Sequence, residues 1–267
     1  MPFYEEIPVK LLVVNADDFG FTRDVNQGIV EAHQGGILTA ATLMANGEAF
    51  GHAVQLAREH PTLDVGCHLV LVGGRSLAEP ARALPAGLAS LMAAVAARRL
   101  RVYDELKAQI HRILDAGLEP SHLDTHKHTH LLPPVLDAVA RLSEEFRIRW
   151  VRRPFPLRLF RRRFHDVLAR HGCRTTDHFA GFLMTGRFHT RQLVRLIAGL
   201  SEGTTEFMCH PGHCGADLAS ARTRLKQSRE RELEALTAAE TRAALEASGV
   251  RLASFRDLAL ATGDERE

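Results

Sequence analysis

Short apolar runs that end in aspartate or histidine, spread along the whole 267-residue chain, are the feature that most constrains its fold. Helix-like segments separate these runs, and one of them, residues 24–33, stops at a pair of glycines as helices commonly do. Alternation of strand and helix implies mainly parallel strands, whose carboxyl ends meet at one edge of a barrel. We therefore predict an α/β fold in a single domain over residues 1–267, a TIM-like (β/α) barrel with eight or fewer regular units. The apolar runs end at Asp17-Asp18, His68, His122–His130 and His210.

The other elements follow from apolar runs bounded by glycine and proline. Strands are expected near residues 39–44, 64–72, 122–130, 149–152, 204–208 and 251–253, and helices near 48–59, 90–116, 223–248 and directly after Pro133-Pro134. Hydrophobic residues make up 45% of the chain, enough for a sizeable core, and a net charge of +2 does not suggest a nucleic-acid binder. No apolar segment reaches the roughly 18 residues of a membrane span, and the first six residues do not resemble a signal peptide. A cytoplasmic protein is expected.

The row His122–His130 places four histidines and Asp124 at every second position. In an extended strand this spacing points all five side chains to one face, where they can hold a metal ion or relay protons. The alternative is a histidine-rich edge strand exposed to solvent. Burial of so many imidazoles must be compensated by hydrogen bonds or a ligand, which favours a functional role.

The pair Asp17-Asp18 ends the first apolar run and precedes Phe19-Gly20. Neighbouring side chains face apart in a regular strand, so we expect one carboxylate to bind a cation and the other to exchange protons. A plain loop with a helix N-cap explains the pair equally well. His68 and His210 are each ambiguous alone, since a lone histidine in a strand is more often a core residue.

Residues 150–164 mix arginines with aromatic and aliphatic side chains, although the whole chain is almost neutral. Such a mixture suits a surface that meets anionic lipid or an amphiphilic substrate. An exposed loop whose apolar residues pack back on the barrel explains it equally well. RNA binding explains it less well, because no wider basic face accompanies the aromatic residues.

Four segments together resemble the signature segments of the YdjC-like carbohydrate deacetylases, in the same order and at similar separations, and the resemblance runs from about residue 10 to residue 255. That family includes chitooligosaccharide deacetylases and deacetylases associated with hopanoid biosynthesis. Residues 68–75, Lys127 and residues 152–155 look more like the hopanoid branch. The four segments are Asn15–Gly20, Gly66–Leu69, His122–His130 and Met208–Pro211.

The resemblance implies a role for each matched residue. The metal ligands would be Asp18, His68 and His126, the general base Asp17, and the candidate general acid His210. Other side chains are expected to orient the ligands or to contact the substrate: Asp124, His128, His130 and Arg153.

Two imidazoles and one carboxylate leave open positions on a cation, which is typical of catalytic rather than structural sites. Ligand softness favours zinc, with magnesium second, and cobalt or manganese could fill the same site. The implied reaction removes acetyl from an N-acetylglucosamine-type sugar, carried by bacteriohopanetetrol or, alternatively, part of a chitooligosaccharide such as diacetylchitobiose. A metallo-phosphohydrolase would need more carboxylates, and a non-catalytic sugar- or metal-binding protein would lack the acid and base. The implied partners are an amino-sugar or glycolipid substrate, the inner face of a membrane, and a second copy in a homodimer.

Overall fold

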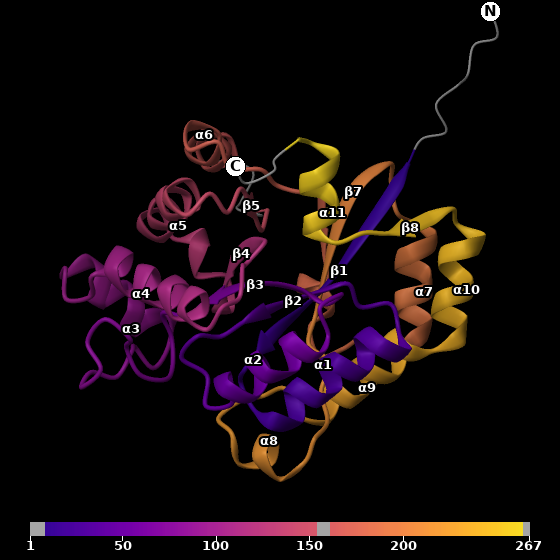
Figure 1. Cartoon of the computed structure of the whole chain (residues 1–267), viewed down its shortest axis with the longest axis horizontal. Helices are drawn as coiled ribbons and strands as arrows, with labels where there is room; N and C mark the ends of the chain where they lie inside the picture. Colours follow the sequence, from indigo (N-terminus) through magenta and orange to yellow (C-terminus); the bar gives the residue numbers. More distant parts are fainter. Residues whose placement is uncertain (1–8, 154–160, 264–267) are drawn as a thin grey trace, which may run out of the picture.

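A computed structural model describes residues 9–153 and 161–263 of the chain. Within these ranges eight strands form one curled sheet surrounded by helices (Figure 1). The order along the sheet is β5-β4-β3-β2-β1-β7-β6, with β8 paired to β1 beside this path, and all these pairs are parallel. The predicted α/β barrel of mainly parallel strands is confirmed, in an irregular form. The strands are β1 (Lys10–Phe19), β2 (Ala40–Leu43), β3 (Asp64–Leu69), β4 (His122–Thr125), β5 (Trp150–Val151), β6 (His178–Ala180), β7 (Gly203–Cys209) and β8 (Val250–Leu252).

The strand β1 crosses the centre of the sheet, and its continuous apolar run suits a strand buried on both faces. It pairs with β7 from Lys10 to Ala16 and with β2 from Asn15 to Phe19. Because β3, β4 and β7 run in the same direction as β1, the residues at their carboxyl ends reach the same edge. This edge collects the polar ends of the apolar runs.

Helices pack their apolar faces against the outside of the sheet (Figure 1). The helix α1 shows why the chain turns there: Thr22 accepts a hydrogen bond from the backbone N–H of Val25 at 3.2 Å, which caps the first turn. The helices are α1 (Arg23–Gly35), α2 (Phe50–Glu59), α3 (Leu88–Ala96), α4 (Val102–Asp115), α5 (Pro133–Glu145), α6 (Arg161–Arg170), α7 (Thr190–Ala198), α8 (Ala216–Ser220), α9 (Gln227–Thr237), α10 (Ala239–Ala247) and α11 (Phe255–Ala261). Two shorter 3-10 segments are η1 (His126–Leu131) and η3 (Phe182–Met184).

Three predicted elements are wrong in extent, each because the backbone turns inside the predicted range. The helix expected over residues 90–116 is two helices, since Arg98 has a φ of +52° that a helix interior does not accept. The helix expected over residues 223–248 is divided at Ala238, which is extended. The strand expected to run to His130 ends at Thr125, where η1 begins. Sequence patterns did not predict β6, α6, α7, α8 or α11.

The two ends of the sheet path, β5 and β6, do not pair with each other in the part of the chain that the structure describes. An isolated bridge links Trp150 to Arg174, a few residues before β6 begins, and Val151 donates a hydrogen bond to the Arg174 carbonyl at 2.9 Å. Residues 154–160, which are much of the basic and apolar stretch 150–164 expected to be either a lipid-facing surface or a loop packed on the barrel, lie outside the described residues. Among the helices that the structure describes, no helix has the length and apolar character needed to cross a membrane.

Candidate active site at the carboxyl edge of the sheet

Asp17 and Asp18 lie at the end of β1, where the strand departs from regular geometry. Asp18 has a φ of +71°, in the left-handed region, and the pairing with β2 shifts register between Ala16 and Phe19. The expectation that the two side chains face apart is therefore wrong, because both carboxylates reach within 4.8 Å of an imidazole nitrogen of His68. A non-glycine residue in the left-handed region lowers the stability of the folded state, and residues strained in this way cluster at functional sites.

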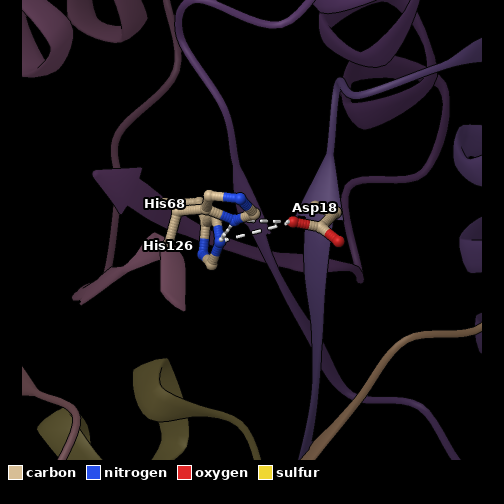
Figure 2. Close-up of side chains that lie close together, drawn as sticks. All are labelled: Asp18, His68 and His126. Carbon is tan, nitrogen blue, oxygen red and sulfur yellow. Dashed lines mark hydrogen bonds and ion pairs between the residues drawn. The ribbon is translucent and has the colours of Figure 1, made fainter. Parts of the chain in front are cut away.

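Asp18, His68 and His126 form a compact cluster suited to a cation. The Asp18 Oδ1 atom lies 3.5 Å from His68 Nε2 and 3.2 Å from His126 Nδ1, and these two nitrogens lie 3.2 Å apart. Figure 2 shows the three side chains, which come from β1, β3 and η1, pointing toward one another. Asp18 Oδ1 is buried and has no hydrogen-bond partner among the described residues, so an oxygen ligand is available for a cation. Two nitrogens and one oxygen fit zinc and leave further positions open.

Asp124 orients His68 within this cluster. Its Oδ1 lies 2.7 Å from His68 Nδ1, which leaves Nε2 facing Asp18 and His126, and Thr42 donates a hydrogen bond to the other oxygen at 3.0 Å. Burial lowers the pKa of His68, but the Asp124 carboxylate raises it more, to about 9. A cation must displace the proton from His68, so binding depends on pH. This contact supports the expected place of Asp124 beside a ligand.

A fully buried guanidinium, that of Arg152, organises the carboxylates below the cluster. It donates to both oxygens of Asp17, at 2.9 and 2.6 Å, and lies 2.8 Å from Asp124 Oδ2 and 2.8 Å from Glu206 Oε1. Burial opposes the charge on Asp17, but Arg152 lowers its pKa below the ordinary value, so Asp17 is a carboxylate. Burial outweighs Arg152 at Glu206 and raises its pKa to about 7. Asp17 is thus held ionised and in one orientation.

A second buried guanidinium binds the other aspartate. Arg229, on α9, places its Nη2 atom 2.5 Å from Asp18 Oδ2, the oxygen that does not face the two histidines. Burial raises the pKa of Asp18, and Arg229 together with His126 lowers it well below the ordinary value. Each aspartate therefore pairs with a different arginine. These separate partners give a physical basis for the expectation that one aspartate binds a cation and the other exchanges protons.

His210 follows β7 and lies on the Asp17 side of the site. Its Nε2 atom is 3.9 Å from Asp17 Oδ2, and its backbone N–H donates to Glu232 Oε2 at 2.6 Å. Burial lowers the pKa of His210 to about 4, against the opposing effect of Asp17, so the imidazole is neutral near pH 7. The structure thus brings together the five residues that the resemblance assigns to the metal, the base and the acid.

The remaining histidines of the row do not share one face, because the chain turns after Thr125. Lys127 and His128 both have positive φ, 55° and 52°, inside η1. His130 is buried and its Nδ1 lies 2.6 Å from Thr125 Oγ1, and burial lowers its pKa to about 3. His122 stacks on Phe255 of α11 at the opposite end of β4. The expectation of five aligned side chains is wrong, and only Asp124 and His126 meet at the cluster.

Arg152, the neighbour of the expected Arg153, enters the charge network. Arg153 donates to the backbone carbonyls of Thr176, at 3.0 Å, and Asp177, just before β6. Arg152 lies within the basic stretch 150–164, and no sequence spacing distinguishes it from the other arginines there. Sequence reasoning also missed Glu206, Arg229 and Glu232, since charged residues in a strand or an amphipathic helix carry no local signal of burial.

A cluster suited to a cation, with a buried carboxylate and an imidazole beside it, occupies the edge of the sheet where barrel enzymes perform their chemistry. The fold and the site therefore define a (β/α)-barrel enzyme with a candidate metal centre. The YdjC-like protein family matches residues 11–247, and the chain belongs to this family.

Named relatives agree over nearly the full length. The chain is 40% identical over 254 residues to a carbohydrate deacetylase of Geobacillus stearothermophilus, covering 93% of this chain and 98% of the relative. It is 35% identical over 260 residues to a chitooligosaccharide deacetylase of Salmonella schwarzengrund, covering 93% and 99%. A crystal structure of an Enterococcus faecalis protein, named for cellobiose-phosphate cleavage, superposes with a TM-score of 0.80 at 25% identity and covers 94% and 99%.

Proposed function

We propose that this enzyme is a metal-dependent N-deacetylase that removes acetyl from an N-acetylglucosamine-type sugar, with a glycolipid, N-acetylglucosaminyl bacteriohopanetetrol, as its substrate. One observation carries the reaction: the Asp18, His68 and His126 cluster lies beside an ionised Asp17 and a neutral His210. The broader class stands on its own, because carbohydrate deacetylases 35–40% identical over almost the whole chain make it a carbohydrate deacetylase, a hydrolase that acts on an amide bond.

In this reaction, Asp17 accepts the proton of the attacking water. Its low pKa keeps it ionised, and the two bonds from Arg152 fix its oxygens. Asp17 passes this proton to the neutral His210 across the 3.9 Å between Asp17 Oδ2 and His210 Nε2, and the imidazolium so formed gives it to the sugar nitrogen as the C–N bond breaks. Acetate and the free amine leave. Asp124 holds His68 in the orientation that faces the cluster.

Asp18, His68 and His126 would hold the cation. A divalent cation bound there polarises the acetyl carbonyl and lowers the pKa of water, which are the contributions such ions make to amide hydrolysis. The nitrogen-rich donor set favours zinc, and magnesium is the second choice.

The lipid-linked substrate is supported by the likeness of residues 68–75, Lys127 and residues 152–155 to the hopanoid branch of the family. A chitooligosaccharide such as diacetylchitobiose is the second candidate, favoured by the relative from Salmonella schwarzengrund. A lipid-borne substrate also implies peripheral contact with the inner face of a membrane. The resemblance to the family also leads us to extend the proposal to a homodimer.

The test offers both substrates to the zinc-loaded protein and follows acetyl loss by mass spectrometry. Acetyl loss from N-acetylglucosaminyl bacteriohopanetetrol with little from diacetylchitobiose is the expected result. Loss from the oligosaccharide alone would reject the lipid substrate while keeping the reaction. Full activity of the chelator-treated protein would reject the metal-dependent mechanism.

A further inference from the structure

Two large apolar side chains stand exposed on the turn that follows β6. Leu183 is 85% exposed and Phe182 is 44% exposed, both in η3. Because β6 runs parallel to β7, this turn leaves the sheet at the same edge as His210. Large apolar groups at the edge of a polar active site are exposed to water at a cost in free energy, and such groups often mark binding surfaces.

An unbroken series of ring contacts connects this turn to the interior of the site. The Arg152 guanidinium lies over the Phe179 ring at 5.4 Å, and the His128 ring lies 6.0 Å from Phe179 and 5.0 Å from Phe182. Arg152 in turn holds Asp17. The aromatic side chains therefore connect the charged cluster to the turn that carries the exposed Leu183.

The turn is fixed to the neighbouring catalytic segment at both ends. Gly181 has a φ of +104°, and a Cβ there would collide with the carbonyl oxygen of Met208, so the turn begins against β7. At its other end, the Gly186 N–H donates to Glu232 Oε1 at 2.8 Å, while the second oxygen of Glu232 accepts the N–H of His210 at 2.6 Å. One buried carboxylate thus holds the turn and the candidate acid in register.

From this geometry we infer that Phe182 and Leu183 form a binding wall for the apolar aglycone of the acetylated amino sugar. The inference rests on the proposed deacetylase function and specifies which part of the chain selects the substrate. For a pyranose without an aglycone, the Phe182 ring would suffice, because the C–H groups of a sugar pack against the face of an aromatic ring. The far more exposed Leu183 offers no hydrogen bond from its side chain and suits a hydrocarbon carrier that extends outward from the sugar.

The experiment compares the methyl and octyl glycosides of N-acetylglucosamine with the full-length, zinc-loaded protein and measures acetate release. The wild type is expected to prefer the octyl glycoside in kcat/KM by about tenfold, because the alkyl chain buries apolar surface. Leu183→Ser should reduce this preference about fivefold through a higher KM for the octyl glycoside, and Phe182→Ala should reduce it as well. The matched control is Leu260→Ser, which replaces a 64% exposed leucine on α11 and should leave the preference unchanged.

Equal use of the two glycosides by the wild type would overturn the wall while leaving the deacetylase function intact. The wall would also be overturned by a preference that survives Leu183→Ser, or by an equal loss in Leu260→Ser. Failure of the wild type to release acetate from these glycosides, from diacetylchitobiose and from N-acetylglucosaminyl bacteriohopanetetrol would overturn the proposed function, and the wall with it.

Discussion

Replacing Asp17 with asparagine tests the division of work between the two adjacent aspartates. The change keeps the size of the side chain but removes its ability to accept a proton. We expect kcat to fall about a thousandfold, the usual scale of a general base, or about 4 kcal/mol of transition-state stabilisation. Bound zinc should stay near one per chain, because Asp18, His68 and His126 are intact.

The structure also limits the effect of this change on folding. Arg152 would lose its paired bonds to Asp17 but would keep Asp124 at 2.8 Å and Glu206 at 2.8 Å. The buried guanidinium therefore stays neutralised, and the free energy of unfolding should fall by only about 2 kcal/mol. Urea unfolding measures this quantity separately from activity.

The companion variant Asp18→Asn should show the opposite pattern of losses. It replaces the carboxylate that faces both histidines, so zinc affinity should fall at least about a hundredfold. The assays are acetate release and atomic absorption of the dialysed proteins, with the exposed Asp137→Asn on α5 as the matched control. Zinc loss in Asp17→Asn comparable to that in Asp18→Asn, or normal turnover in Asp17→Asn, would refute the assignment.

Three further outcomes follow from the same contacts. Arg152→Lys keeps the positive charge but loses the paired hydrogen bonds to Asp17. We expect kcat to fall about tenfold and, because these bonds lower the pKa of Asp17, the acidic limb of the pH–rate profile to move to higher pH. An unchanged profile would contradict the role of Arg152. Chelation should abolish acetate release and lower the thermal midpoint, and zinc at a hundred times its Kd should restore about 3 kcal/mol, as calorimetry can check. Burial raises the pKa of Glu232 from 4.5 to about 7, so between these pH values the folded state holds a proton that the unfolded chain has lost. The free energy of unfolding therefore falls as pH rises through that interval. Urea titrations at pH 4.5 and 7.5 measure this fall, and Glu232→Gln should make it smaller by up to about 3 kcal/mol.

The barrel could be predicted from the sequence because its signals are local, whereas the members of the cation cluster could be named only through the resemblance to the family. An apolar run that ends in Asp18 or His68 shows both the strand and its polar carboxyl end, and the alternation with helices implies the shared edge. The turn at His126 could not be predicted in this way. Histidine at every second position is compatible with a strand, and the left-handed φ of Lys127 and His128 depends on packing that the spacing does not record.

The charge network could not be predicted because its members come from distant parts of the chain. Arg152 meets Asp17 across 135 positions and Glu206 across 54. In the sequence, an arginine next to another arginine looks like a residue exposed on the surface. The same is true of Arg229, which lies in a charged helix. Only the three-dimensional arrangement shows which of them is buried.

The position of Arg152 just after the terminal strand β5 has a consequence for the stability of the sheet. Beyond β5, the sheet continues only as an isolated bridge from Trp150 to Arg174, whereas Arg152, two residues after Trp150, reaches partners on β1, β4 and β7. The guanidinium therefore connects the end of the terminal strand β5 to β1, β4 and β7 through side-chain hydrogen bonds and ion pairs. Arg152 also holds Asp17, the carboxylate on which the reaction depends. A change that displaces Arg152 therefore weakens the contacts among these strands and the positioning of the general base at the same time.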